Sequence, residues 1–205
     1  HAIFLDCKDL KYNLVPLSLN GYKIVISNTN KKRSLAHSKY NERRSECEKG
    51  LEILRNIIPR ATCLGEITLD EYMKHKHIIK DEIVRKRVEH VIAEDDRVLK
   101  SVEALSRNDI LEFGRLMVGS HHSLKDLYEV TGVELDTLVE EALKIEGVIG
   151  SRMTGAGFGG CTVSIVREDA VGKFIERVGQ NYFNRVGLQA SFYISDIGDG
   201  GKEIK

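Results

Sequence analysis

Several features are scarce or missing in this 205-residue sequence, and each absence excludes a class of protein. The 31 Lys and Arg residues are balanced by 31 Asp and Glu residues, so the formal net charge is zero. This balance argues against a dedicated nucleic-acid binder and against a binder of anionic membranes, because both usually carry a basic excess. No apolar run approaches the roughly 20 residues that span a bilayer, and no signal-peptide pattern is recognisable.

The cysteines and histidines of the sequence do not form the pattern of a disulfide-bonded or zinc-binding protein. The cysteines Cys7, Cys47, Cys63 and Cys161 are widely scattered and form no C-x-x-C pair. This distribution fits reduced thiols better than disulfides or a zinc site, so we predict a cytoplasmic protein. The histidines lack the spacing of zinc ligands, and we interpret them as surface or core residues: His75, His77, His90, His121 and His122.

Apolar periodicity predicts a chain of alternating element types. Period-two alternation predicts strands at residues 2–6, 12–17, 22–28, 148–153, 161–165 and 189–194. Helical spacing predicts helices at 36–58, 81–105, 134–145 and 168–184, with one more that begins after Asn108 as its N-cap. The buried stripe expected for the longest helix comprises Val84, Val88, Val91, Val98, Val102 and Leu105. The dipeptide Asn20-Gly21 predicts a hairpin between the second and third strands.

These elements predict an α+β domain over residues 1–205. We expect a ferredoxin-like antiparallel sheet with helices on one side and a helical insertion at about 60–130. The sequence opens inside a strand-like run at His1, so we expect it to be part of a longer protein.

Four glycines crowd into one short segment: Gly155, Gly157, Gly159 and Gly160. The segment matches G-x-G-x-x-G, but a strand follows it, whereas a dinucleotide site needs a helix there. A P-loop is excluded because the Gly-Lys-Ser/Thr ending is missing. Two interpretations remain: a turn whose glycines let two layers pack closely, or a backbone concavity that contacts a phosphate or a second phosphate-binding loop.

Three segments carry a family resemblance. Met153 to Cys161, M-T-G-A-G-F-G-G-C, resembles the third signature motif of the GHMP kinases, and its wording is similar to the galactokinase branch. Residues 26–44, together with Leu5-Asp6-Cys7 and Leu14-Val15-Pro16, are similar to the region where that branch passes from strands into its first long C-terminal helix. Asp199-Gly200-Gly201 resembles the closing motif of the family.

The resemblance implies ATP-dependent phosphorylation of the galactose 1-hydroxyl. It also implies an N-terminal domain that carries the sugar-binding motif, the ATP loop and the catalytic aspartate, none of which occurs in this sequence. ATP and Mg²⁺ are therefore expected as cofactors of the longer protein, and galactose and ATP as partners bound through its N-terminal domain. We expect the 205 residues alone to be inactive and to bind no cofactor or metal.

The resemblance assigns roles to two parts of the chain. Tyr40 is the expected galactose contact, since a phenol offers a hydroxyl to a sugar oxygen and a flat face to C–H groups. The loop that supports the transferring phosphate comprises Gly155, Ala156, Gly157, Phe158, Gly159 and Gly160. No residue of this chain is expected to act as the catalytic base or to bind a metal. Cys161 is expected to be a strand residue and not a nucleophile.

Structural interpretations remain open beside these roles. Tyr40 could be a half-buried tyrosine at a helix start. Asn28 and Asn30 could cap or turn the strand end instead of lining a sugar pocket. A basic cluster is interpreted as a solvated surface run more readily than as a phosphate site: Lys31, Lys32, Arg33, Lys39, Arg43 and Arg44.

Three other functions compete with a galactokinase. One is a related sugar sensor that binds galactose and ATP but regulates transcription. Another is a sister kinase acting on N-acetylgalactosamine or another sugar. The third is a free-standing ferredoxin-like regulatory domain, which the abrupt start of the sequence disfavours.

Overall fold

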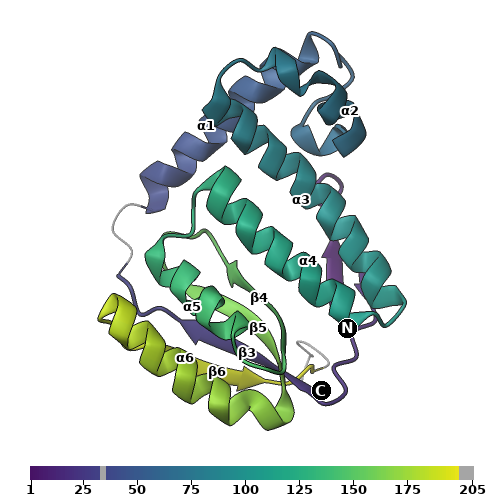
Figure 1. Cartoon of the computed structure of the whole chain (residues 1–205). Coiled ribbons are helices and arrows are strands. Elements are labelled where there is room, and N and C mark those ends of the chain that lie inside the picture. The colour runs from purple at the N-terminus through teal and green to yellow at the C-terminus, as the bar shows by residue number, and fades with distance from the viewer. Residues whose placement is uncertain (33–35, 199–205) are drawn as a thin grey trace, which may run out of the picture.

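The structure is a computed structural model, and it describes residues 1–32 and 36–198 (Figure 1). The side chains of residues 36–38 also lie outside this description. Arg33 of the basic cluster and the Asp199-Gly200-Gly201 motif therefore fall outside the described residues.

A four-stranded antiparallel sheet forms the base of the molecule. Its strands are β3 (Tyr22–Asn28), β4 (Val148–Thr154), β5 (Cys161–Arg167) and β6 (Ser191–Ser195). They lie in the order β4-β5-β3-β6, with every neighbouring pair antiparallel. Since a helical stretch follows β3 and a helix follows β5 along the chain, this is the predicted ferredoxin-like arrangement.

Two helices cover one face of the sheet. They are α5 (Val133–Leu143) and α6 (Val171–Val186), which lie side by side in Figure 1. Alternate residues of the strands point toward them, so Val25 and Val166 pack with Leu138, Phe174 and Tyr182 in one core. The helical cover on one side of the sheet was predicted, and burial of this apolar face is what stabilises it.

A cluster of helices between β3 and β4, called the insertion below, forms a second core above the sheet, and it begins with α1 (Ala36–Arg55), ahead of the predicted bounds of about 60–130. It also contains α2 (Leu69–His75) and α3 (Glu82–Ser106). Its buried side chains include Leu54, Tyr72, Ile79, Val88 and Ile92. The short helix α2 was not predicted, although its start carries a capping box in which Thr68 and Glu71 bond each other's backbone N–H groups.

Helix α4 (Ile110–Ser123) packs along β4, the edge strand of the sheet. The backbones of Gly114 and Gly150 come so close that a Cβ added to Gly114 would lie 2.2 Å from the carbonyl oxygen of Ile149. The backbone N–H of Met153 donates to Nδ1 of buried His121 at 3.3 Å. The helix therefore shields an edge that would otherwise present unpaired backbone groups.

The predicted hairpin at Asn20-Gly21 was wrong. The strand β2 (Tyr12–Val15) pairs with β1 (Ala2–Leu5), whereas β3 pairs with β5 and β6. Asn20-Gly21 still forms a turn, in which Tyr22 N–H donates to the Leu19 carbonyl at 2.8 Å. The dipeptide signal reports local turn geometry, and pairing with distant strands overrode it.

Two helix details also differ from the prediction. The N-cap of α4 is Asp109, whose carboxylate accepts from Glu112 N–H at 3.0 Å, and Asn108 instead adopts φ 57°. Val98, placed in the buried stripe of α3, is 44% exposed because this part of the helix extends past the insertion core.

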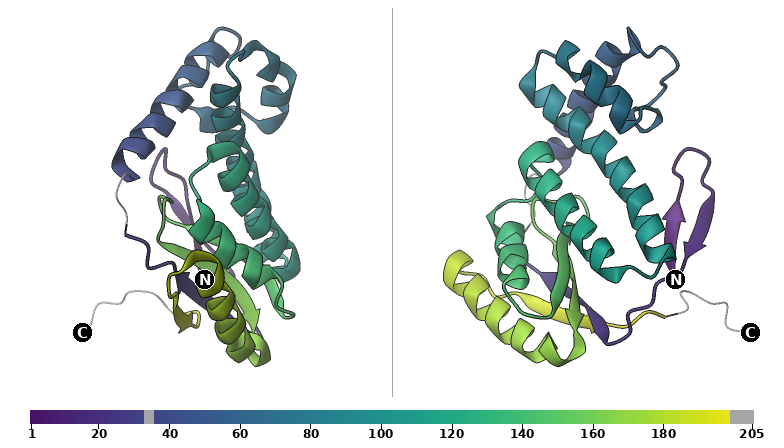
Figure 2. Two further views of the ribbon diagram at one scale, coloured as in Figure 1. Left: turned by 60° about the vertical axis from the view of Figure 1, so that its left-hand side comes forward. Right: turned by 45° about the vertical axis from the view of Figure 1, so that its right-hand side comes forward.

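The β1–β2 hairpin stands apart from the four-stranded sheet (Figure 2). The cross-strand pairs Ile3–Leu14 and Leu5–Tyr12 share one face, and all four side chains are exposed. A two-stranded hairpin is marginal without packing, so this face is unusually apolar for a free surface. Within residues 1–32 and 36–198, no helix has the length and apolarity needed to cross a membrane.

Replacing Gly114 with Ala tests the close approach of α4 to β4. We expect the free energy of unfolding to fall by about 1–3 kcal/mol, because the added methyl meets backbone that cannot move aside. Urea denaturation measures the change. Gly172→Ala is the control, since nothing lies within 4 Å of the added Cβ; it should leave stability unchanged or raise it by up to about 1 kcal/mol. Equal effects of the two changes would contradict the packing described.

A buried histidine makes the stability of the insertion depend on pH. His90 is 6% exposed, hydrogen bonds Ser123 Oγ through Nδ1 at 2.8 Å, and stacks on Tyr128 with ring centroids 4.4 Å apart. Burial, followed by the positive charges of Arg97, Arg152 and Arg87, lowers the pKa of His90 to about 4.

The unfolded chain, in which histidine has a pKa of about 6.5, binds this proton more readily than the folded one. Stability should therefore fall as pH drops from about 6.5 to about 4, by about 3 kcal/mol in total. His90→Gln should flatten that part of a pH-resolved urea titration, whereas the exposed-site control His122→Gln should not. A wild-type slope that survives in His90→Gln would contradict this.

Candidate functional site

The predicted glycine loop joins β4 to β5 and is built from unusual backbone. Gly155, Gly157, Gly159 and Gly160 have φ values of 86°, 84°, 113° and 96°, and Phe158 has 57°. Side chains other than glycine tolerate this left-handed region poorly, which explains the glycine density. Gly155 and Ala156 are exposed at the tip, whereas Gly157 and Gly159 are buried.

One side of the loop is fixed to the end of β3. The Oγ1 of buried Thr29 donates to the Gly160 carbonyl at 2.9 Å and accepts from Gly160 N–H at 3.1 Å. The backbone N–H of Thr29 donates to the same carbonyl at 2.9 Å. Tyr182 of α6 donates its hydroxyl to the Thr29 carbonyl at 2.8 Å. The loop is thus tied through Thr29 to the core between sheet and helices.

The other side of the loop rests on the segment before α5. Phe158 N–H donates to the Val130 carbonyl at 2.8 Å. A Cβ added to Gly157 would lie 2.1 Å from that same oxygen, so only glycine fits at this position. The inner glycines therefore permit close backbone packing, as the first interpretation expected, while contact of the exposed tip with a phosphate stays a prediction.

Tyr40 lies in the first half of α1 and is 56% exposed. It lines an apolar groove of about 330 Å³ together with Cys47, Leu51 and Tyr128. Tyr128 comes two residues before Val130, the residue that supports the loop. The helix that carries Tyr40 and the loop thus meet one common segment, and Figure 1 shows α1 starting near the end of the sheet where β4 turns into β5.

The strand-end asparagines take structural roles. Asn28 accepts from Asn30 N–H at 3.0 Å, which turns the chain after β3. Asn30, at φ 53°, donates its side-chain amide to Gln189 O and Ser191 Oγ, both at 2.9 Å. These bonds support the capping interpretation, since they use the amide groups within the protein.

The sequence predicted that the whole basic cluster is a solvated surface run, but the structure buries one of its members. Lys31 pairs with Glu134 at 2.8 Å, Lys39 with Glu42 at 2.9 Å, and Arg44 with Glu48 at 2.9 Å. Arg43, in contrast, is only 6% exposed. Its prediction as a surface residue was wrong, because one side of α1 at this position faces the segment before α5.

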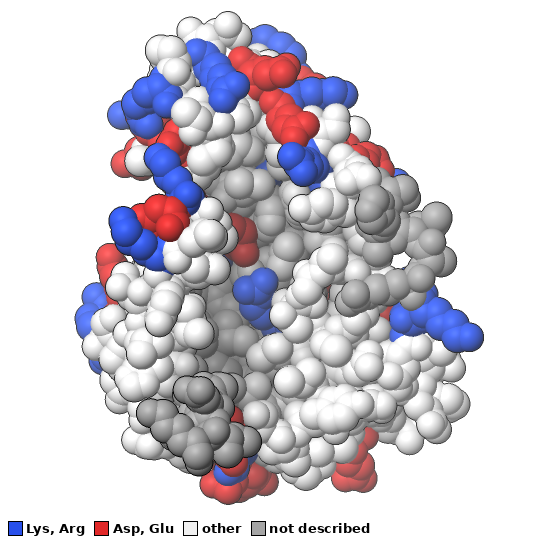
Figure 3. Space-filling view, turned by 180° about the vertical axis from the view of Figure 1, so that it is seen from behind, with Lys and Arg blue, Asp and Glu red and all other residues white. Residues whose placement is uncertain are grey.

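A hollow that the sequence did not reveal lies beside the loop. Seen from behind, the molecule is hollowed between the insertion and the sheet, and a basic side chain lies within the hollow (Figure 3). A pocket of about 250 Å³ is lined by α3, α4, β4 and β5, and Thr154, the last residue before the loop, forms part of its wall.

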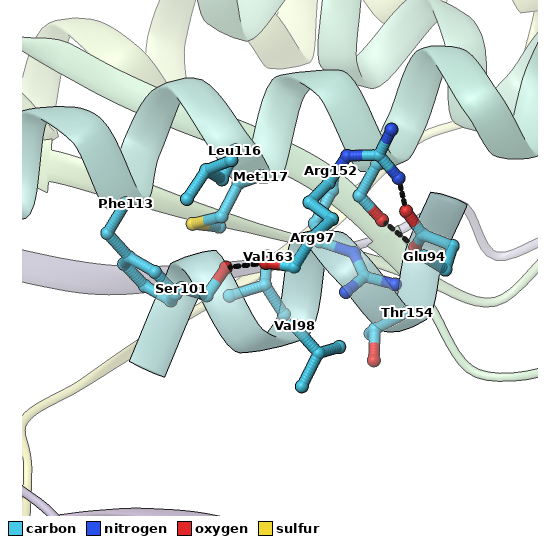
Figure 4. Close-up of a pocket in the computed structure, with 11 residues that line it drawn as sticks. Glu94, Arg97, Val98, Ser101, Phe113, Leu116, Met117, Arg152, Thr154 and Val163 are labelled. Carbon is cyan, nitrogen blue, oxygen red and sulfur yellow. Dashed lines mark hydrogen bonds and ion pairs between the residues drawn. The ribbon is translucent and has the colours of Figure 1, made fainter. Parts of the chain in front are cut away.

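Two guanidinium groups and one carboxylate dominate this pocket. Arg97 forms an ion pair with Glu94, while Arg152 donates its Nε–H to the Met153 carbonyl at 3.0 Å; Figure 4 shows a single guanidinium joined to Glu94. Burial lowers the pKa of Arg152, and burial together with the nearby Arg152 lowers that of Arg97. The pocket can hold a polar group, and Tyr40 is not among its lining residues.

Metal-ligand chemistry finds no support in the described part of the chain. No group of three His, Cys, Asp or Glu side chains in that part could hold an ion. The histidines of the core, His90 and His121, are engaged with Ser123 and with Asp136. Cys161 is half-buried and begins β5.

Replacing Gly157 with Ala tests the packing of the loop on Val130. We expect a loss of about 3 kcal/mol or more, because left-handed backbone and a clash with a carbonyl oxygen act together. Gly187→Ala is the control: Gly187 has φ 76° but nothing within 4 Å of an added Cβ, so only the backbone cost of about 1–2 kcal/mol applies. Urea denaturation compares the two, and equal losses would contradict the contact with Val130.

Comparison with known proteins agrees with this geometry. Residues 101–184 match the family described as "GHMP kinases C terminal". A galactokinase of Fusobacterium nucleatum is 55% identical over 205 residues, which are 100% of this chain and 53% of that protein. A galactokinase of Clostridium acetobutylicum is 56% identical over 203 residues, 99% of this chain and 52% of that protein. The chain thus spans about half the length of the curated relatives it matches.

Solved structures show the same relation. The galactokinase of Lactococcus lactis, crystallised with galactose, has a TM-score of 0.93 and 46% identity, covering 98% of this chain and 52% of that one. A homoserine kinase of Cytophaga hutchinsonii, at 16% identity and a TM-score of 0.55, shares the fold alone. In sequence and in fold, the chain is similar to the C-terminal part of galactokinases, and its residues 101–184 match the C-terminal family of the GHMP kinases.

Proposed function

We propose that this chain is the C-terminal half of an enzyme that transfers the γ-phosphoryl group of ATP to O1 of D-galactose. The observation that carries the proposal is the similarity to proteins named galactokinase over the whole chain, at 55% identity. The Lactococcus lactis relative was crystallised with galactose, which supports a galactose substrate here. The three relatives reported above at 46–56% identity are each named galactokinase, and none of the three is named as a sensor or as a kinase of another sugar.

Within that reaction the loop 155–160 belongs on the phosphate side. Its exposed tip at Gly155 and Ala156 lets backbone approach a phosphate group, while Thr29 and Val130 hold its inner residues in place. Phosphoryl transfer depends mainly on positioning and charge neutralisation, so a rigid loop without bulky side chains suits it. ATP and Mg²⁺ are the cofactors that the proposal requires, held mainly by groups outside this chain.

Tyr40 belongs on the sugar side. Its exposed phenol, on the rim of an apolar groove, can offer a hydroxyl to a sugar oxygen and a ring face to sugar C–H groups. Neither Tyr40 nor the loop performs proton transfer in this proposal. The catalytic base is expected in the remaining half of the protein.

The remaining half is proposed to be an N-terminal ATP-binding domain. The exposed apolar face of the β1–β2 hairpin, formed by Ile3, Leu5, Tyr12 and Leu14, supports this, because such a face is stable only when covered. The 205 residues alone are proposed to be inactive. We also assign the protein to the cytoplasm, where the four cysteines, all free thiols in the structure, would stay reduced.

Kinetics of the natural protein that contains this chain test the proposal. It should release ADP in a galactose-dependent reaction, and the isolated 205 residues should not. Tyr40→Phe should raise the KM for galactose roughly fivefold to tenfold, the worth of one hydrogen bond to a sugar hydroxyl. Tyr193→Phe, at another exposed tyrosine in β6, should change nothing. An unaltered KM in Tyr40→Phe would remove Tyr40 from the sugar site, and the absence of galactose-dependent turnover would refute the proposal.

A further inference from the structure

Two buried arginines meet at residues 127–130, the segment that contacts both the glycine loop and the groove beside Tyr40. Arg43 comes from α1, three residues after Tyr40, and Arg87 comes from α3 of the insertion. They are 6% and 2% exposed. Arginine is rarely buried to this extent unless its charge and its N–H groups are matched by partners.

Both guanidinium groups bind the carbonyls at the end of one short helix. The π-helical turn η3 (Leu124–Tyr128) is followed by Glu129 in left-handed conformation, φ 55°. Arg43 donates to the carbonyls of Tyr128 at 2.7 Å and of Glu129 at 3.3 Å, and Arg87 donates to that of Leu127. Carbonyls at a helix end lack intrahelical donors, and a rigid guanidinium fork can satisfy several of them at once.

Two shared carboxylates balance the two positive charges. Glu46 lies 3.3 Å from Arg43 Nη1 and 2.9 Å from Arg87 Nε. Glu129 lies 2.7 Å from Arg87 Nη2. Each arginine therefore binds backbone carbonyls of residues 127–129 and the shared carboxylate of Glu46. The side chains of Arg43, Arg87, Glu46 and Glu129 and the backbone of residues 127–129 form one connected unit.

This unit stands between the two parts of the proposed site. On one side, Tyr128 lines the groove that also contains Tyr40. On the other, Val130 accepts the hydrogen bond of Phe158 N–H at 2.8 Å and leaves room only for glycine at 157. A shift of residues 127–130 would therefore move the support of the loop and a wall of the Tyr40 groove together.

Resting on the proposed function, we propose that Arg43 and Arg87 are positioning residues of the kinase, which fix the Tyr40 helix relative to the phosphate-side loop. Neither residue touches substrate in this role. Arg43 binds two carbonyls and the carboxylate of Glu46, whereas Arg87 binds one carbonyl and the carboxylates of Glu46 and Glu129. A lysine in place of either keeps the charge but lacks the planar fork that makes three such contacts at once. The arginine geometry, and not the positive charge, is what the reaction would depend on.

The test is steady-state kinetics on the natural protein with Arg43→Lys and Arg87→Lys, at a temperature well below the melting temperature of each variant. Both changes should lower kcat/KM for galactose by about tenfold or more, since small displacements of reacting groups are expensive. Arg43→Lys should also raise the KM for galactose, because Arg43 shares a helix with Tyr40. Arg87→Lys should act mainly on kcat. Millimolar guanidinium should partly restore Arg43→Ala, which a general loss of stability would not allow.

Two matched controls separate positioning from ordinary destabilisation. Arg115→Lys changes an exposed arginine of α4, which pairs with Glu112 at 2.7 Å. Arg55→Lys changes an arginine at the other end of α1 that also binds two carbonyls, of Ala61 and Thr62, both at 2.9 Å. Both controls should stay within about twofold of wild type.

A further variant covers the case in which the lysine changes prevent folding. Glu129→Gln removes the ion pair with Arg87 at a half-exposed carboxylate and should give a smaller loss of kcat. If the wild type is active and Arg43→Lys and Arg87→Lys are as active as the controls, the inference is overturned and the proposed function stands. The same holds if the wild type is active and Glu129→Gln is unaffected. An inactive wild type would overturn the proposed function and the inference with it.

Discussion

The contact between bare backbone at Gly157 and the carbonyl of Val130 is the constraint on which the site depends. It brings the β4–β5 turn against the segment that precedes α5, and a Cβ added there would lie 2.1 Å from the oxygen. Thr29 completes the fixation from the side of the sheet, through bonds of 2.9 Å and 3.1 Å to Gly160. A loop held from both sides keeps its open tip in one place, and the proposed function requires this of an element beside a phosphate.

The helical insertion has a structural role in this arrangement. The ferredoxin-like sheet with α5 and α6 has its own core and does not need α1 to α3 to close it. The insertion instead contributes the helix of Tyr40 and, through Arg43 and Arg87, the bonds that hold residues 127–129. Under the proposed function, its core is a rigid support for the sugar side of the site, and the sheet is the support for the phosphate side.

Much of the fold could be predicted from the sequence, because alternation and helical spacing are local signals. The strands at 22–28 and 161–165 and the helix at 81–105 lie within a few residues of the observed elements. Pairing is not local, and so the hairpin assigned to Asn20-Gly21 was wrong. The start of α2 was missed although Thr68 and Glu71 carry a readable capping signal.

The site was only partly predictable. The loop and Tyr40 were found through motifs, and their roles stay predictions. The sequence could not separate buried Arg43 from exposed Arg44, since neighbouring arginines look alike until a partner segment from far along the chain covers one of them. The pocket around Arg97 and Arg152 was missed for the same reason: its walls come from α3, α4 and two strands.

Hydrogen–deuterium exchange on the natural protein tests the central claim most directly, by adding galactose and a non-hydrolysable ATP analogue. The account predicts that backbone amides of residues 155–160 and of the first turns of α1 gain protection together, because both belong to one site. Protection of only one of these regions, or of the face of α6 away from the sheet, would contradict it.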